Sequence, residues 1–416
     1  MAESTPTFPE GSFADDEWKG VNLTDPDLLQ AFRNDPYPFL EHLRRVDPVN
    51  RTPLGMWRVT RYEDCQHLLR HDTATGVRLA DGRRFGEELL PPTLRDGSQF
   101  MLSQDPPVHT RLRKLVSKAF TPRAIARIRP RIEEIARSQL DAARERGEMD
   151  VVRDLALPVP ATMICEMMGV PVEDRERFTR WTSDATHLLA ALTSPPEVIE
   201  RGLAASTALN DYFQDLIAAR RRALRDDILS DLIRAEAAGD RLSAEELVIQ
   251  AVGLLIAGFE TTIGLIGNGI RQLIRHPDQL ARLRADPALI EPAVEECLRF
   301  DGPILLTVRV AHADLAVGGK TIPKDAMIFV MLGAANRDPK VFDEPQRFDL
   351  GRDPNPHIAF GGGTHLCLGA HLAREEARVA IGEFVRRTGE VAIQEDGVAW
   401  GSSLFRVLGR LPVRLA

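Results

Sequence analysis

Residues 360–370 read Phe-Gly-Gly-Gly-Thr-His-Leu-Cys-Leu-Gly-Ala, and a helical pattern follows them to about residue 387. Glycines let a backbone approach a flat or close neighbour. Cys367 stands where this last helix is predicted to start. Free backbone amides and the positive end of the helix dipole there favour a thiolate over a thiol. The stretch therefore suits an axial metal ligand, although a glycine loop before a chance cysteine would look the same.

The other cysteines are Cys65, Cys165 and Cys297, and none forms a Cys-x-x-Cys pair. This spacing argues against a disulfide framework and a structural zinc site. An isolated cysteine is usually a small buried apolar residue. We predict that role for these three.

The composition is that of an ordinary globular protein, with 44% hydrophobic and 27% charged residues in 416. A net charge of −8, from 53 basic and 61 acidic residues, argues against general nucleic-acid binding. The first twenty residues have neither a basic start nor an apolar run, so we expect no signal peptide or membrane anchor. We predict a flexible arm over 1–20, one domain over 21–416, and a cytoplasmic location.

One predicted helix stands out. Ser243-Ala244-Glu245-Glu246 is a capping box, and the helical pattern continues to about Arg275. Residues 251–267 (AVGLLIAGFETTIGLIG) are apolar on nearly every face, which fits a transmembrane span or the central helix of a large domain. Glu260 in mid-run favours the buried helix. A buried carboxylate and the adjacent Thr261 then need a functional explanation.

The rest of the chain predicts a mainly α fold with a minor β part. Helical patterns cover 107–146, with Pro122 and Pro130 as interruptions, and most of 158–270. Short strands are predicted at 50–62 and 303–350. A long loop is predicted at 72–104, and hairpins are predicted at 391–415.

The 360–370 stretch resembles the haem-binding loop of the cytochrome P450 family, Phe-Gly-x-Gly-x-[His/Arg]-x-Cys-x-Gly. The matches at fixed positions are Phe360, Gly361, Gly363, His365, Cys367 and Gly369. The resemblance implies the cytochrome P450 fold, with a long central helix over the haem and the cysteine loop beneath it. It implies haem b as cofactor and Cys367 as the iron ligand.

Two further motifs follow the family's order. Residues 257–262 (AGFETT) are similar to its oxygen-activation motif on the central helix. Glu296-x-x-Arg299 is similar to its Glu-x-x-Arg motif, and Arg347 would complete that network. Alone, a Glu/Arg pair three residues apart is more often a solvated surface bridge.

Residues 105–113 (DPPVHTRLR) resemble the family segment whose histidine and arginine hold a haem propionate. At a spacing of four residues, His109 and Arg113 share one face of a helix. Arg309 and His365 are similar to the family's other propionate partners. These four residues are therefore the predicted partners of the haem carboxylates.

The resemblance implies a monooxygenase that inserts one atom of O2 into a hydrophobic small molecule. Thr261 would hydrogen-bond the oxygen undergoing activation, and Glu260 would connect water there to bulk solvent. By analogy, a pocket would be lined by the long loop, by the region near 180–200 and by single residues: Ile256, Ala257, Ile304, Leu305 and Leu404. Core packing explains these apolar positions equally well.

Electrons derived from NAD(P)H would come from a separate ferredoxin and its reductase, because the chain carries no nucleotide-binding fingerprint. A docking patch is predicted at Arg111, Arg113, Lys114 and Lys118, although a solvated helix face fits nearly as well. The alternatives are a peroxide-driven or non-hydroxylating member of the family, and a haem-bound sensor or ligand carrier without turnover. The Glu260-Thr261 pair argues against the first, and the lack of a visible output module against the second.

Overall fold

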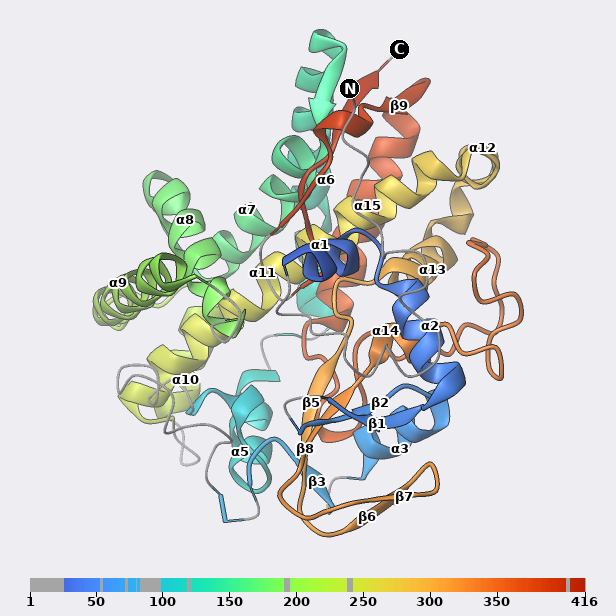
Figure 1. Ribbon diagram of the computed structural model, residues 1–416. Coiled ribbons are helices and arrows are strands. Elements are labelled where there is room, and N and C mark those ends of the chain that lie inside the picture. The colour runs from blue at the N-terminus through green and yellow to red at the C-terminus, as the bar shows by residue number, and fades with distance from the viewer. Residues whose placement is uncertain are drawn as a thin grey trace. The chain divides into compact units, whose positions relative to one another are not determined.

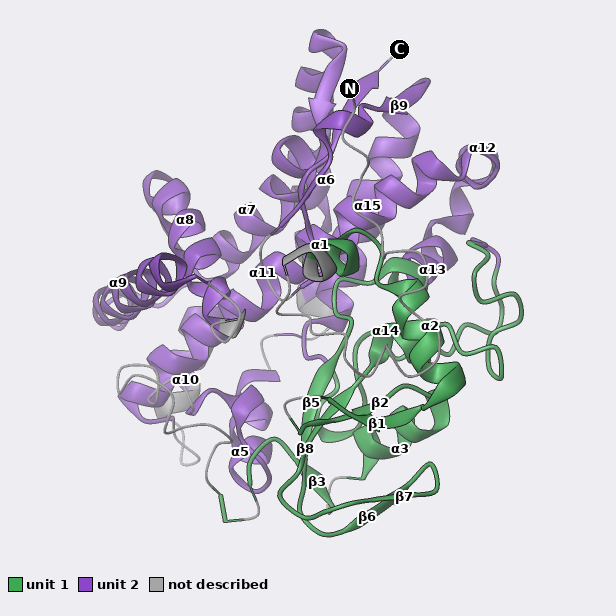
Figure 2. Cartoon of the chain, viewed as in Figure 1, with its two compact units in different colours: residues 1–85, 298–348, 352–366 green, residues 86–297, 349–351, 367–416 purple. Residues whose placement is uncertain are grey.

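The computed structural model describes residues 26–415 except 53–54, 72–73, 80, 83–98, 118–119, 121, 191–194, 238–241 and 402–404. Its contacts divide the chain into two compact units (Figure 2). Unit 1 comprises 1–85, 298–348 and 352–366, and unit 2 comprises 86–297, 349–351 and 367–416. The predicted arm over 1–20 lies outside the described residues. One domain over 21–416 stays a prediction.

Unit 1 is organised by a five-stranded sheet in the order β1-β2-β8-β5-β3 (Figure 1). These strands are β1 (Val49–Arg51), β2 (Trp57–Val59), β3 (Thr75–Gly76), β5 (Thr307–Ala311) and β8 (Met327–Val330). A separate hairpin joins β6 (Leu315–Val317) and β7 (Lys320–Ile322). The helices are α1 (Pro26–Asn34), α2 (Tyr37–Val46), α3 (Tyr62–Arg70) and α14 (Leu332–Ala335). The predicted strand pair in 50–62 and the short strands in 303–350 are confirmed.

Apolar side chains of the sheet form the core of unit 1. Val49, Val59 and Ile328 are fully buried and pack with Cys65 and Leu68 of α3. A second cluster packs Phe39 and Leu40 of α2 against the segment after residue 304.

Unit 2 is mainly helical. Its helices are α5 (Val108–Val116), α6 (Pro122–Arg146), α7 (Pro158–Met167), α8 (Arg175–Thr186), α9 (Pro196–Arg220), α10 (Ile228–Ala237), α11 (Ala244–Arg275), α12 (Pro277–Ala285) and α15 (Ala370–Arg387). Helix α13 (Ile290–Asp301) starts in unit 2 and ends in unit 1. The strands are β4 (Glu148–Asp150), β9 (Val391–Ile393), β10 (Ala399–Trp400), β11 (Leu408–Arg410) and β12 (Pro412–Leu415). The mainly α prediction with a minor β part is confirmed.

The long helix α11 is the centre of unit 2 and packs against α7, α8, α9 and α15. Its capping box is formed: the Glu246 amide donates to Ser243 Oγ at 3.0 Å, and the Ser243 amide donates to Glu246 Oε2 at 2.8 Å. Among the described residues, α11 is the one helix long and apolar enough to cross a membrane. However, 61% of its most apolar window is buried inside the protein. Core helices pass the same test, which agrees with the prediction of a buried central helix.

Two local predictions were wrong, and a third was incomplete. Pro122 starts α6 as expected, but Pro130 lies inside α6 without ending it. The last helix begins at Ala370, so Cys367 lies in the turn before it. Of the terminal strands, β10 and β11 form the expected hairpin, whereas β12 pairs with β9 and with the distant β4, because a strand can find a partner far along the chain.

Candidate functional site

The middle of α11 is open along one side. Its residues are buried on both flanks, but a few remain partly or fully exposed: Gly253, Ile256, Ala257, Gly258, Glu260 and Thr261. We call these six residues the open stripe. A Cβ atom placed on Gly258 would meet no atom within 4 Å. Positions three and four apart share a helix face, so the stripe is a surface of unit 2 on which another group can lie.

The two adjacent threonines of α11 have different surroundings. Thr261 Oγ1 donates to the Ala257 carbonyl at 3.0 Å, and Thr262 Oγ1 donates to the Gly258 carbonyl at 3.2 Å. Thr261 is partly exposed on the open stripe, whereas Thr262 is buried. Only Thr261 of this pair therefore offers its hydroxyl to a molecule on the stripe.

The cysteine loop is shaped by glycines. In unit 1, Gly361 and Gly363 have φ angles of 74° and 64°, which residues with a Cβ rarely adopt. The Gly361 amide donates to the Ile358 carbonyl at 2.9 Å, and the Leu366 amide to the Gly363 carbonyl at 3.1 Å. The turns bring the chain to an exposed Leu366 and Cys367.

Cys367 differs from the other cysteines: it is exposed, whereas Cys65, Cys165 and Cys297 are buried as predicted. The thiol is open to solvent yet surrounded by enough protein that desolvation raises its pKa. The Gly369 amide and the guanidinium groups of Arg113 and Arg374 oppose this rise in pKa without reversing it. The sequence suggested that the start of the helix favours the thiolate. The helix start does not by itself achieve this. A metal cation bound to the sulfur would stabilise the thiolate, because a thiol that coordinates a metal loses its proton.

His109 and Arg113 lie one turn apart on α5, as predicted. His109 is 2% exposed, and its amide donates to the Asp105 carbonyl at 3.0 Å. Burial lowers the pKa of Arg113, and the charge of Cys367 raises it. Unit 2 thus brings the predicted iron ligand and one predicted propionate partner close enough to interact electrostatically.

The other predicted cofactor residues belong to unit 1. Arg309 is 4% exposed on β5, and its Nη1 donates to the Val308 carbonyl at 2.9 Å. His365 ends a short 3-10 turn, Gly363–His365. The Phe360 ring is partly buried, with its centroid 6.3 Å from that of His357. The roles of these residues toward a cofactor stay predictions.

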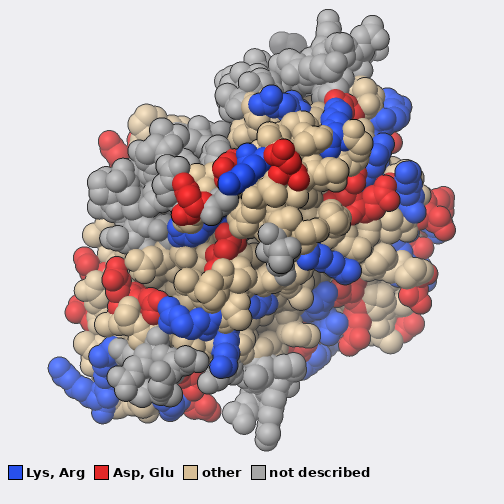
Figure 3. Space-filling model, turned by 90° about the horizontal axis from the view of Figure 1, so that it is seen from below, with Lys and Arg blue, Asp and Glu red and all other residues tan. Residues whose placement is uncertain are grey.

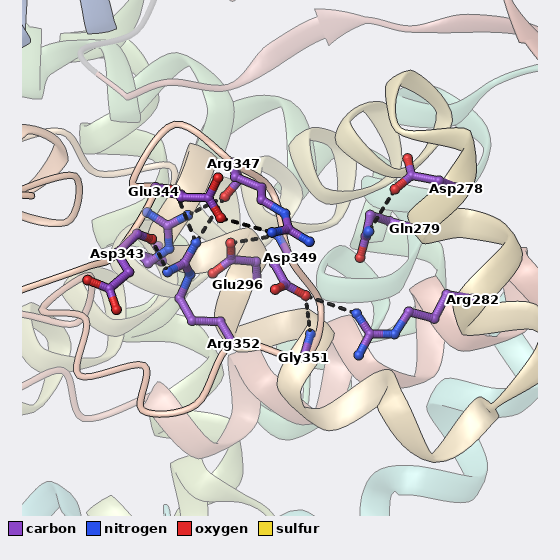
Figure 4. A network of polar contacts seen from close by, with 11 residues as sticks. Asp278, Gln279, Arg282, Glu296, Asp343, Glu344, Arg347, Asp349, Gly351 and Arg352 are labelled. Atoms are coloured by element: carbon purple, nitrogen blue, oxygen red, sulfur yellow. Dashed lines mark hydrogen bonds and ion pairs between the residues drawn. The ribbon is translucent and has the colours of Figure 1, made fainter.

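The Glu-x-x-Arg pair lies on α13 and its polar contacts are buried. Glu296, 0% exposed, accepts from the Asp349 amide at 3.0 Å, and Asp349 Oδ1 accepts from Gly351 and Arg282 at 2.9 Å (Figure 4). Arg299 donates to the carbonyl oxygens of Asn336, Pro345 and Arg347, each at 3.0 Å. Arg347 therefore takes part in this network through its main-chain carbonyl. Its guanidinium binds the exposed Glu344 at 2.9 Å.

Comparison with known proteins decides the family. The sequence pattern that describes "Cytochrome P450" matches residues 54–290 and 288–393. 6-Deoxyerythronolide B hydroxylase of Saccharopolyspora erythraea is 40% identical over 413 residues, covering 94% of this chain and 99% of that relative. The chain belongs to the cytochrome P450 family. Vitamin D(3) 25-hydroxylase of Pseudonocardia autotrophica is also 40% identical, over 398 residues, covering 92% of this chain and 95% of that relative.

Solved structures confirm the predicted cytochrome P450 fold. P450BioI, in complex with an acyl carrier protein ligated to hexadec-9Z-enoic acid, superposes with a TM-score of 0.85 at 36% identity. The match covers 92% of this chain and all of that one. CalO2 superposes with a TM-score of 0.86 at 34% identity, over 95% of this chain and 98% of that one. This cytochrome P450 is therefore a bacterial-type monooxygenase, an oxidoreductase.

The cytochrome P450 family implies a haem cofactor, and the residues of this chain fit one. Cys367 is the exposed cysteine, on a loop whose glycines hold it in tight turns. On the open stripe, Gly258 faces empty space where a Cβ atom would stand. Among the described residues, no three or more His, Cys, Asp or Glu side chains gather as a metal-binding group. The donor set thus fits an iron that takes four ligands from a porphyrin and one from the protein.

The predicted pocket residues lie in different surroundings. Ile256 and Ala257 are partly exposed on the open stripe. In unit 1, Leu305 is 9% exposed and packs with the α2 cluster, and Ile304 packs against the sheet core. Core packing accounts for these two side chains, and their assignment to a pocket stays a prediction. Leu404, together with most of the 72–100 loop, lies outside the described residues.

Sequence reasoning missed Glu376 of α15. It is 2% exposed, and burial raises the pKa of its carboxyl to about 8, against an opposing hydrogen bond with Thr262. Near neutral pH the protonated carboxyl can donate to Thr262, whose own proton goes to the Gly258 carbonyl. The available signal was an acid four residues after Leu372 on the buried face of the helix.

Replacing Arg299 with Ala should lower the free energy of unfolding by about 3–5 kcal/mol, the usual cost of removing one partner from a buried charged network. Arg299 is 1% exposed, and three carbonyl oxygens would lose its donors. Urea denaturation of the purified protein measures the loss. The matched control is Arg347→Ala, since the carbonyl remains and the side chain is 57% exposed. A change within about 0.5 kcal/mol is expected for that control, and equal losses in the two variants would contradict the assignment.

Proposed function

We propose that this cytochrome P450 is a haem-thiolate monooxygenase that hydroxylates or epoxidises a hydrophobic small molecule, with electrons from a separate ferredoxin and its reductase. One oxygen atom of O2 enters the substrate and the other leaves as water, with two electrons and two protons consumed. The observation that carries the proposal is that unit 2 holds both an exposed cysteine in the turn before α15 and an open stripe with a carboxyl and a hydroxyl on α11.

Cys367 is the proposed ligand of the haem iron. A haem iron with a thiolate ligand supplies the electron density that favours cleavage of the O–O bond. His109 and Arg113 would pair with one haem carboxylate, supported by their shared face on α5. Arg309 and His365 are proposed as further carboxylate partners on the strength of the family resemblance. Phe360 would shield the sulfur from water, and the amides of the glycine turn, including Gly361, would donate toward it.

Protons must reach the oxygen across an apolar surface. We assign this task to Thr261 and Glu260, both partly exposed on the open stripe. The Thr261 hydroxyl now donates to the Ala257 carbonyl, and a rotation about χ1 redirects it toward a molecule on the stripe. Glu260, the neighbouring ionisable group, would pass protons from solvent to a water held by Thr261.

The substrate is proposed to be lipophilic and bound mainly by burial of its apolar surface. Ile256 and Ala257 offer apolar contacts beside Thr261, and Ile304, Leu305 and Leu404 are further proposed contacts. The named relatives act on vitamin D(3) and on 6-deoxyerythronolide B, and one solved neighbour is bound to an acyl carrier protein. These names support a bulky apolar substrate without identifying it. They also support a role in secondary metabolism.

The electron donor is proposed to be an acidic ferredoxin in the cytoplasm. On the face that Figure 3 draws, Lys and Arg side chains are interspersed with Asp and Glu in small groups. Of the predicted docking residues, Arg111 forms an ion pair with Glu246 and Arg113 interacts with Cys367. Lys118 lies outside the described residues. Lys114 is exposed and is a proposed contact of an acidic partner.

The proposal is tested by supplying the purified holoenzyme with ferredoxin, reductase and NAD(P)H, or with hydrogen peroxide alone, in the presence of a hydrophobic compound selected by a spectral binding screen. Product is expected only with the electron-transfer system, with one oxygen atom from 18O2 incorporated. Product from peroxide alone would favour the peroxide-driven alternative. Ligand binding without any turnover would favour the sensor or carrier.

A further inference from the structure

Helix α11 holds a short segment of the chain by two hydrogen bonds from one side chain. Gln250 is 0% exposed. Its Nε2 donates to the Gln99 carbonyl at 3.1 Å, and its Oε1 accepts from the Met101 amide at 3.1 Å. A buried glutamine that satisfies both a donor and an acceptor fixes the backbone on either side of Phe100.

Gly253, one turn further along α11, makes room for the Phe100 ring. A Cβ atom at this position would lie under 3.0 Å from three carbon atoms of that ring, closer than real Cβ contacts allow. A side chain on residue 253 would therefore force the ring to move. The missing side chain acts as a notch into which the aromatic ring fits.

The notch lies at one end of the open stripe. Ala257 and Thr261 follow Gly253 at successive turns of the same helix face, roughly 6 and 12 Å along the axis. Phe100 itself is only partly buried, so part of its side chain stays accessible to a neighbouring group. All of these residues belong to unit 2.

We infer that Gln250 and Gly253 are positioning residues that hold Phe100 as an aromatic wall over the open stripe, so that Phe100 determines which apolar groups fit beside Ala257. The inference rests on the proposed function, because it takes the stripe to be the place where substrate lies. It deepens that function by naming a specificity-determining side chain and the two residues that fix it. The ligand class it predicts carries a flat or aliphatic group that packs against an aromatic ring.

The test uses two ligands that bind a haem iron through the same nitrogen, imidazole and 4-phenylimidazole. Spectral titration of the ferric holoenzyme gives both dissociation constants, and their ratio reports how well the protein contacts the extra phenyl group. Phe100→Ala should reduce the preference for 4-phenylimidazole about fivefold, the range of one aromatic contact. Imidazole binding should stay within about twofold, because imidazole is too small to reach the wall.

A double-mutant cycle separates positioning from general packing. Gly253→Ala should reduce the preference as Phe100→Ala does, and the combined variant should be no worse than Phe100→Ala alone. Gln250→Leu should likewise reduce the preference for 4-phenylimidazole, with no further loss when it is combined with Phe100→Ala. Gly267→Ala is the matched control on α11, since a Cβ atom there meets its nearest neighbours at 3.8 and 4.0 Å, which is ordinary contact. It should leave both constants unchanged.

An unchanged ratio in Phe100→Ala would overturn the inference, and so would a loss from Gly253→Ala that persists in the Phe100→Ala background. If either result were obtained with protein whose reduced carbon-monoxide spectrum is normal, the proposed function would still stand. A wild-type protein in which neither azole shifts the haem spectrum, or which carries no haem, would overturn both. The two failures are therefore distinguishable.

Discussion

Replacing Cys367 with Ser is expected to abolish monooxygenase activity while the chain still folds. Cys367 is exposed in the turn before α15 and fills no core position, so its loss removes little packing. A hydroxyl is a weaker donor to iron than a thiolate and lacks its push on the O–O bond. Product formation should fall by more than roughly 10²-fold, the loss that mutation of a metal's outer-shell partner already reaches. Turnover with ferredoxin, reductase and NAD(P)H measures this.

The matched control is Cys65→Ser. Its thiol is buried and donates to the Val59 carbonyl at 3.2 Å, a bond that a serine hydroxyl can keep. This variant should retain the thiolate spectrum and activity of the wild type. If Cys367→Ser retained that spectrum, the ligand would have to be another residue.

Replacing Thr261 with Ala is expected to separate electron consumption from product formation. The hydroxyl that organises proton delivery on the open stripe is lost, while the helix keeps its backbone hydrogen bonds. Product should fall about 10²-fold, the lower end of what a positioned proton-transfer group contributes. NAD(P)H oxidation should continue, with reduced oxygen released as hydrogen peroxide. Simultaneous assays of product, NAD(P)H and peroxide measure the coupling.

The control for this experiment is Thr261→Ser, which keeps the hydroxyl and should restore most of the coupling. Thr262→Ser probes the neighbouring position, whose hydroxyl serves the Gly258 carbonyl and Glu376 instead. It should leave the coupling near the wild-type value. Normal coupling in Thr261→Ala, with unchanged turnover, would contradict the role of Thr261.

Local rules were sufficient for the main elements of the fold. The capping box at Ser243 and the apolar run after it predicted α11 because each depends on neighbours in the chain. Pro130 was misread as an interruption, since helix context can tolerate a proline that propensity alone disfavours. The pairing of β12 with β4 joins segments more than 250 residues apart, and no local pattern contains it.

The chemistry of the site could be predicted where a sequence motif specifies the residues. It was less predictable where the burial of a side chain determines its pKa or its contacts. The order of motifs placed Cys367 and Thr261 in a known family. The direction of the Cys367 pKa was not predictable from its place before a helix, because desolvation outweighs the amide and the two arginines. Gln250, Gly253 and Glu376 were missed, since only the fold shows what a buried side chain or an absent one faces.

The most direct measurement for the central claim is the reduced carbon-monoxide difference spectrum of the purified wild-type protein. If Cys367 binds a haem iron as a thiolate, the Soret band must lie at the strongly red-shifted position of thiolate-ligated haem, and the band must be absent in Cys367→Ser. A band at the position of histidine-ligated haem in freshly prepared, active protein, or a protein that binds no haem, would contradict the account.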